Sequence, residues 1–177
     1  MTVLEQRGAL KVLAGAIGVC LLTASSYVSV PLYPVPVTMQ TLAVLMLGVV
    51  LGPRDGALTV LSWLGLALAG APVLANASGG AAAFAGPTVG YLMAFPVAAF
   101  LAGMLPKPLS LTQGALAFSG FLGLHGLMLA SGWVWLSVLI GPETAFAAGV
   151  VPFLLGSVVK ASMALGITAA WPAHWRP

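Results

Sequence analysis

The chain has 177 residues, of which 60% are hydrophobic and only 5% are Asp, Glu, Lys or Arg. A soluble domain carries about a quarter charged residues, so this composition excludes a surface that faces water. The apolar excess must face lipid, and we expect one domain, 1–177, that forms an integral membrane protein. The net charge of +3 includes no basic run, which argues against nucleic acid as a partner.

Six apolar segments predict transmembrane helices. Charged residues and clusters of Pro and Gly separate them, and a helix needs about 20 residues to cross the hydrocarbon core. The second and third segments are short, which a small tilt or shielding by neighbours would accommodate. The predicted fold class is therefore all-α, a bundle of six transmembrane helices. The spans cover about 10–30, 37–52, 56–70, 88–105, 111–131 and 153–172.

The basic residues give this bundle a direction. With a cytoplasmic N-terminus, five of them fall on the cytoplasmic side, and Glu143 lies in an outer connection. This distribution follows the positive-inside rule. We therefore predict that both termini are cytoplasmic and that the protein crosses the cell (inner or plasma) membrane several times. The five residues are Arg7, Lys11, Arg54, Lys107 and Arg176.

Small residues recur every fourth position in the first span, at Ala16, Cys20 and Ala24. Such a face lets helices approach closely, either within the bundle or against a partner. Cys20 is the only cysteine, which excludes an intrachain disulfide. The span itself is longer than the apolar region of a signal peptide, so we interpret it as a retained helix.

The predicted outer connections are long, whereas the inner ones are tight turns. The outer connections cover 30–41, 72–91 and 132–152. Function tends to lie on such loops, so the asymmetry predicts a binding site that opens outward; simple turns are the alternative.

Several polar residues at this outer side could contact a ligand. Thr38 and Gln40 flank the start of the second span and could bind neutral polar groups, although Gln40 could equally cap a helix or bond to another one. For Asn76, turn formation is the favoured interpretation. Tyr91 lies near the outer interface, where an aromatic belt accounts for it, or where it forms a ligand's apolar wall.

Lys160 lies inside an otherwise apolar segment, about two turns after Pro152. An ionisable residue within a span indicates function by default; the alternative is a lysine that snorkels to the interface. A buried ammonium requires an anion, and the nearest acid, Glu143, lies far back in a loop. The carboxylate of a ligand would supply that anion.

Signatures of enzymes are missing from the sequence. No cluster of His, Cys and carboxylates predicts a metal, His125 and His174 are isolated, and no phosphate-binding Gly-rich loop occurs. We expect no catalytic residue, metal or cofactor. Any ATP hydrolysis must come from partner subunits.

Four segments resemble the BioY proteins, the biotin-specific substrate-binding components of energy-coupling-factor vitamin transporters. They are VPVTMQTLAVL at 35–45, LGPRDGA at 51–57, GPTVGYL at 86–92 after Gly79-Gly80, and GVVPFLLGSVVK at 149–160 after Trp135-Leu136. The resemblance covers nearly the whole chain in the right order and spacing.

This resemblance implies a transport protein whose substrate is biotin, held near the outer surface, capped by the first outer loop and contacted by the second. It implies a membrane coupling subunit and two ATPase subunits as partners, docked on Ala16, Cys20 and Ala24; some members work alone or as homo-oligomers. The predicted ligand-binding residues are Thr38, Gln40, Asn76, Gly79, Gly80, Tyr91, Ser157 and Lys160.

The chain departs from the family's pattern at one position. The family usually has Asp three residues before the lysine, where this chain has Ser157. Ser157 shares a helix face with Lys160 but cannot neutralise it, so a ligand carboxylate would do so alone or the affinity would differ. The alternatives are a binding component for another small vitamin and a membrane scaffold subunit without a ligand.

Overall fold

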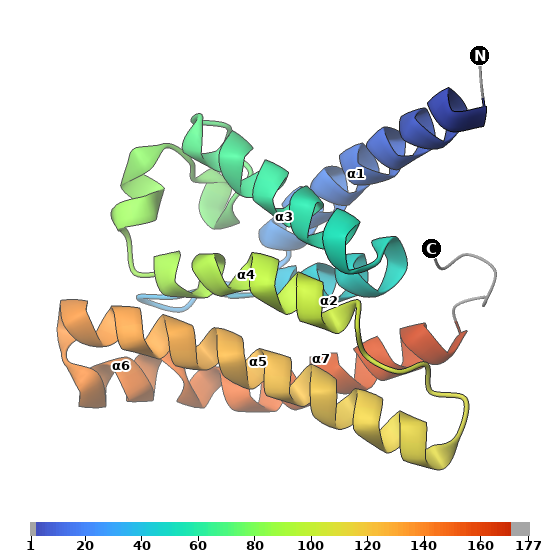
Figure 1. Cartoon of the computed structure of the whole chain (residues 1–177). Coiled ribbons are helices and arrows are strands. Elements are labelled where there is room, and N and C mark those ends of the chain that lie inside the picture. The colour runs from blue at the N-terminus through green and yellow to red at the C-terminus, as the bar shows by residue number, and fades with distance from the viewer. Residues whose placement is uncertain (1–2, 171–177) are drawn as a thin grey trace.

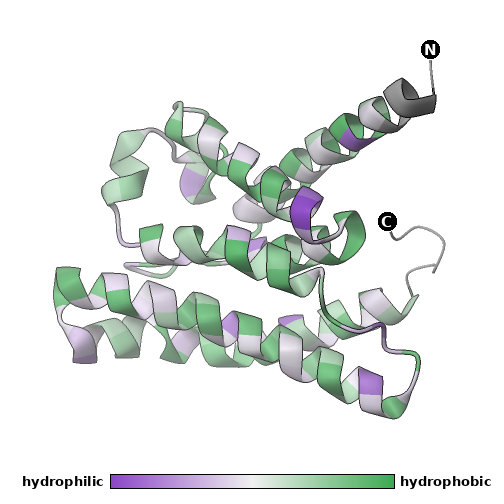
Figure 2. Cartoon of the chain, in the orientation of Figure 1, coloured by the Kyte–Doolittle hydropathy of each residue, from purple (hydrophilic) through white to green (hydrophobic). Residues whose placement is uncertain are grey.

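The computed structural model describes residues 3–170, with side chains from Gly8 onward. Within that range the chain is mainly α-helical, and the helices are predominantly apolar (Figure 2). The helices are α1 (Val3–Tyr27), α2 (Gln40–Leu51), α3 (Pro53–Leu68), α4 (Val89–Ala102), α5 (Leu111–Ile140), α6 (Pro142–Gly149) and α7 (Val151–Ala170). Arg176 lies outside the described residues, as do the side chain of Arg7 and the last two residues of the predicted sixth span.

Two loops carry short regular elements. In the first loop, β1 (Ser29–Val30) pairs antiparallel with β2 (Val37–Thr38). In the second, the 3-10 turns η1 (Ala75–Ala77) and η2 (Ala81–Ala85) follow α3.

The helices form two layers around α4, which contacts α2, α3 and α5 (Figure 1). α5 runs alongside α6 and α7 in one layer, and α1 crosses the other side of the molecule, packed on α2 and α3. The start of α1, the α2–α3 turn, the α4–α5 connection and the end of α7 lie toward one end of the bundle. The second loop and the α5–α6 junction lie at the opposite end.

Glycine followed by proline produces two of the short helix junctions. Gly52 and Gly141 have φ of 85° and 84°, a left-handed conformation that costs a glycine little. Pro53 and Pro142 then occupy the first turns of α3 and α6, where the missing N–H has no helical partner to lose. The sequence therefore reverses the chain within one or two residues at both places.

The prediction of an outer connection over 132–152 is wrong. α5 continues through Gly132 to Ile140, and α6 and α7 cover almost all of the remainder. Gly132 lies inside this helix, where its missing side chain leaves the space that the ring of Tyr91 occupies. The second predicted span also begins late, at Gln40, because residues 37–38 pair with β1.

Three glycines let α2, α3 and α4 approach at backbone distance. A Cβ at Gly48 would collide with the carbonyl oxygen of Ala99 on α4. A Cβ at Gly56 of α3 would lie 2.7 Å from the Cα of Gly48, and one at Gly103 would lie 2.6 Å from the Gly48 carbonyl oxygen. Gly48 is thus the point at which the three helices meet.

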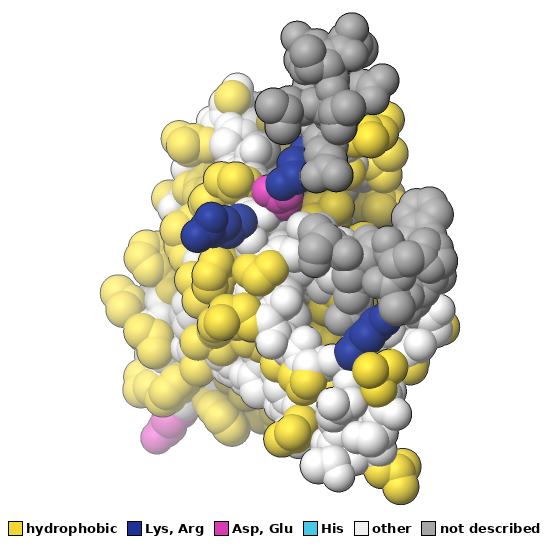
Figure 3. Space-filling view, turned by 45° about the vertical axis from the view of Figure 1, so that its right-hand side comes forward, with side chains coloured by type: hydrophobic (Ala, Val, Ile, Leu, Met, Phe, Trp, Pro, Cys, Tyr) yellow, Lys and Arg dark blue, Asp and Glu magenta, His cyan; other side chains and the backbone are white. Residues whose placement is uncertain are grey.

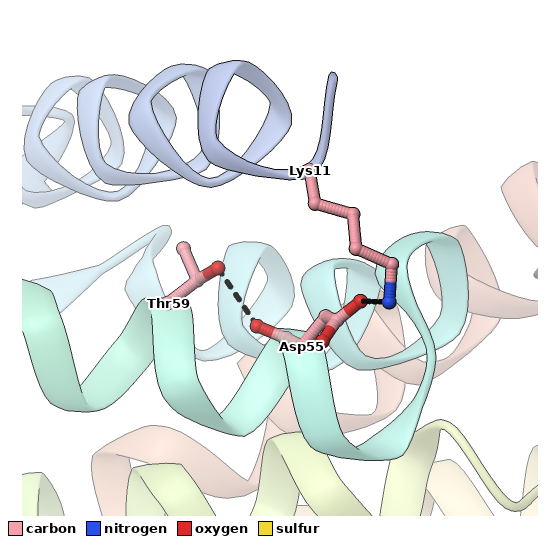
Figure 4. Close-up of polar contacts among 3 residues, drawn as sticks. All are labelled: Lys11, Asp55 and Thr59. Atoms are coloured by element: carbon pink, nitrogen blue, oxygen red, sulfur yellow. Dashed lines mark hydrogen bonds and ion pairs between the residues drawn. The ribbon is translucent and has the colours of Figure 1, made fainter. Parts of the chain in front are cut away.

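Among the residues whose side chains the structure describes, one ion pair joins α1 to α3 (Figure 4). Lys11 Nζ lies 2.8 Å from the carboxylate of Asp55, and Thr59 Oγ1 donates to the Asp55 carbonyl oxygen over 2.8 Å. The pair is largely exposed, so it contributes about 0–1 kcal/mol to stability. The packing of α1 on α3 therefore depends mainly on apolar contacts, such as that of Gly18 with Thr59.

The surface is that of a membrane protein. Within the described part of the chain, three helical segments are long and apolar enough to cross a membrane: Gly8–Tyr27, Leu111–Ile140 and Pro142–Ala170, the last combining α6 and α7. Helices α2 and α4 are apolar but shorter. Large hydrophobic side chains are exposed along α1, α5 and α7. Figure 3 shows a face on which hydrophobic side chains predominate and charged ones are few.

Candidate ligand-binding cavity

A cavity of about 590 Å³ lies among α2, α4, α5 and α7, beneath the first and second loops. This volume is within the range of small-molecule sites, roughly 300–1,000 Å³. Seven of the eight predicted ligand-binding residues line it, although they come from four separate parts of the chain. They are Thr38, Gln40, Asn76, Gly79, Tyr91, Ser157 and Lys160.

Lys160 places a cation in the wall of this cavity. It lies halfway along α7 and is only 8% exposed, so it does not snorkel to an interface. Its Nζ donates to the carbonyl oxygen of Thr38 over 2.6 Å and to Thr41 Oγ1 over 3.1 Å. Among the described residues no Asp or Glu pairs with it. Two of its three N–H donors therefore bond to neutral oxygens, and its charge stays uncompensated by the protein.

Thr38 and Gln40 form a small polar group at the start of α2. Thr38 Oγ1 donates to Gln40 Oε1 over 2.9 Å and accepts from the Gln40 backbone N–H over 3.3 Å. Gln40 is 6% exposed, and its Nε2 has no hydrogen-bond partner among the described residues. Since an unpaired buried donor costs free energy, this amide is suited to a ligand acceptor.

Ser157 reaches the same cavity one turn before Lys160. Its hydroxyl donates to the Phe153 carbonyl oxygen over 2.9 Å, within α7. This bond uses the hydroxyl proton, so the Ser157 oxygen can act toward the cavity only as a hydrogen-bond acceptor. Ser157 therefore makes no hydrogen bond to Lys160 among the described residues and, as a neutral hydroxyl, does not neutralise it.

Tyr91 forms an apolar wall of the cavity and ties α4 to the α6–α7 junction. Its hydroxyl donates to the carbonyl oxygen of Gly149 over 2.6 Å, and its ring stacks on that of Phe153 with centroids 6.0 Å apart. Gly132 and Gly149 leave room for it, because a Cβ at either position would collide with the Tyr91 side chain.

The second loop contributes Asn76 and Gly79 but not Gly80. Asn76 is exposed and adopts a left-handed conformation, φ 57°, that asparagine tolerates better than most residues. A Cβ at Gly79 would collide with the carbonyl oxygen of Ala71. Gly80, with φ 78°, donates its N–H to the Ala67 carbonyl oxygen over 2.6 Å, away from the cavity wall.

Hydrogen bonds from the end of α1 hold this second loop in place. Ser26 Oγ donates to the carbonyl oxygen of Val73 over 2.8 Å, and the Tyr27 hydroxyl donates to that of Pro72. Segment 34–36 of the first loop also lines the cavity. Both loops therefore border the cavity, and the second is fixed to the end of α1.

His125 is a cavity residue that the sequence did not single out. It lies on α5, is 2% exposed and lines the cavity. Its Nδ1 lies 2.9 Å from the Phe121 carbonyl oxygen, and its Nε2 has no hydrogen-bond partner among the described residues. The sequence around an isolated histidine in an apolar segment does not predict that it lines a cavity, because the residues that surround it come from other helices.

Residues 3–176 of the chain match the family model of the BioY family. This chain belongs to the BioY family. The Pyrococcus horikoshii protein named "Probable biotin transporter BioY" is 40% identical over 85% of this chain and 88% of its own length. The "Biotin transporter BioY" proteins of Rhodobacter capsulatus and Thermotoga maritima are 35% and 37% identical, over 84% and 79% of this chain and 85% and 82% of their own lengths.

A solved structure has the same fold. The crystal structure of the S-component for biotin from an ECF-type ABC transporter matches with a TM-score of 0.79 and 29% identity, over 96% of this chain and 93% of that chain. The family and the fold confirm an all-helical membrane transport protein of the BioY family rather than an enzyme.

Proposed function

We propose that this BioY-family chain is the biotin-binding component of a biotin uptake transporter and captures biotin in the cavity beneath its two loops. The uncompensated charge of Lys160 carries the proposal. A buried cation with only neutral partners is stabilised by a ligand anion, and biotin has one carboxylate. Biotin also has a neutral cyclic urea and an apolar ring and chain, which suit the free polar atoms and the apolar wall formed by Tyr91.

Equilibrium binding to the purified protein tests this function. We expect biotin to bind at micromolar concentration or tighter and to be displaced neither by unrelated vitamins nor by biotin methyl ester at the same concentration. Displacement by a different carboxylate-bearing vitamin at lower concentration would indicate that the site serves that vitamin. A protein that binds none of these would be a scaffold subunit, and the proposal would fail.

We propose further that the chain crosses the cell membrane six times with both termini in the cytoplasm, with α6 and α7 forming the last crossing. Lys11, Arg54 and Lys107 support this orientation, because they lie toward one end of the bundle while Glu143 lies at the other. The cavity and its loops would then open to the outside.

The exposed side of α1 is the proposed docking face for a membrane coupling subunit that works with two ATPase subunits; a second copy of this chain is the alternative occupant. Ala16, Cys20 and Ala24 are all exposed, whereas Gly18, on the neighbouring side of α1, packs against Thr59 of α3. The three small residues are therefore free to receive a closely packed helix.

Cysteine labelling tests both proposals. Cys20 is the only native cysteine, so Lys107→Cys and Glu143→Cys are made in a Cys20→Ser background. We expect an impermeant maleimide to label Glu143→Cys in intact cells and Lys107→Cys only after permeabilisation; the reverse pattern contradicts the orientation. In the native chain, a membrane-permeant maleimide should label Cys20 more slowly when the coupling subunit is co-expressed, and equal rates contradict the docking face.

A further inference from the structure

The cavity contains a hydrogen-bond acceptor that neither the sequence motifs nor the charge of Lys160 account for, and it belongs to His125. The imidazole is held by one bond: Nδ1 lies 2.9 Å from the Phe121 carbonyl oxygen. A carbonyl oxygen can only accept, so Nδ1 carries the hydrogen. In the neutral ring Nε2 is then an acceptor with a free lone pair.

This acceptor is buried, and the residue that carries it lines the ligand cavity. His125 is 2% exposed and lines the cavity, and Nε2 has no partner among the described residues. A buried polar atom without a partner destabilises the protein unless something in the cavity pairs with it. Burial in an apolar helix bundle disfavours a charged imidazolium, so the ring is considered in its neutral form.

Gln40 supplies the complementary group. Its Oε1 is occupied by the Thr38 hydroxyl, so the free end of its amide is a donor. The cavity therefore presents one unpaired neutral acceptor, on α5, and one unpaired neutral donor, at the start of α2. A cyclic urea offers the matching set, because each N–H donates and the carbonyl oxygen accepts.

We propose that His125 is a ligand-specificity residue whose Nε2 accepts a hydrogen bond from a ureido N–H of biotin, with the free Gln40 amide donating to the same neutral group. Ser157 is a weaker candidate for this acceptor, because it is a neutral hydroxyl whose proton is bound to the Phe153 carbonyl oxygen. Recognition of the urea is thereby separated from the charge of Lys160. The inference rests on the proposed function.

Two substitutions at one position test it. Asparagine reproduces the Nδ1 side of histidine, so His125→Asn keeps the bond to Phe121 but presents nothing at the Nε2 position. His125→Gln is longer and places an amide oxygen near the Nε2 position. We expect His125→Asn to weaken biotin binding about tenfold or more and His125→Gln to stay within about threefold of the unchanged protein. A merely structural histidine would give the opposite order, and that order overturns the inference.

A second measurement needs no variant. Biotin methylated on a ureido nitrogen should bind the unchanged protein about tenfold more weakly than biotin, and this difference should shrink in His125→Asn, because the variant has already lost the bond. Equal binding of the two ligands to the unchanged protein overturns the inference.

Thr168→Val is the matched control. Thr168 is likewise buried, and its hydroxyl has no partner among the described residues, but it does not line the cavity, so its removal should leave biotin affinity unchanged. Failure of the unchanged protein to bind biotin overturns the proposed function and this inference together. Binding with equal affinities for the His125 variants overturns the inference alone.

Discussion

Replacing Lys160 with Met is expected to weaken biotin binding by at least about 30-fold. Removing one partner of a buried, hydrogen-bonded charge pair costs about 2–5 kcal/mol, and 1.4 kcal/mol corresponds to tenfold. The variant loses the cation for the ligand carboxylate. It also leaves the Thr38 carbonyl oxygen and the Thr41 hydroxyl without their donor, so the start of α2 is less firmly held against α7.

A ligand without the carboxylate distinguishes the loss of the Lys160 cation from the loss of the hydrogen bonds that hold α2 against α7. The unchanged protein should bind biotin more tightly than biotin methyl ester, which lacks the negative charge, whereas Lys160→Met should bind the two about equally. Isothermal titration in one detergent measures all four affinities. Lys11→Met is the control, because Lys11 is paired with Asp55 on the surface and is remote in sequence and structure from the cavity lining. An ester that binds the unchanged protein as tightly as biotin would place the carboxylate elsewhere.

The sequence predicts the outline of this site because its strongest signals are local. A few neighbouring positions suffice to recognise a lysine among apolar residues, a cluster of prolines or a Gly-Pro junction. Contacts between distant positions carry no such signal. Lys160 donates to the backbone carbonyl oxygen of Thr38, 122 positions away, and the sequence around neither residue predicts this contact.

Gly132 and His125 show what local patterns miss. The sequence interpretation treated Gly132 as the beginning of a loop, but its role depends on Tyr91, whose ring comes from another helix. In the sequence His125 is an isolated histidine that belongs to no metal-binding or catalytic cluster, yet the fold places it in the same cavity lining as Gln40 and Lys160. In both cases tertiary contacts, rather than the residue's own propensity, determine the outcome.

Gly48 is the position at which a single methyl group should most disturb the bundle. In Gly48→Ala the new Cβ collides with the Ala99 carbonyl oxygen, which belongs to the backbone of α4 and cannot rotate away. Overpacking of this kind costs about 1–3 kcal/mol, and more where the backbone must move. We therefore expect a loss of about 3 kcal/mol, which corresponds to about 6–12 °C in the melting temperature for a chain of this size.

Gly65→Ala supplies the matched control for this prediction, since Gly65 lies inside α3 and a Cβ there would meet nothing within 4 Å. Alanine favours a helix over glycine by about 1 kcal/mol, so this variant should melt at the same temperature or slightly higher. Because α2 carries Gln40 at its start, separation of α2 from α4 in Gly48→Ala should also weaken biotin binding. Equal melting temperatures for Gly48→Ala and Gly65→Ala would show that the three helices do not meet at backbone distance at Gly48.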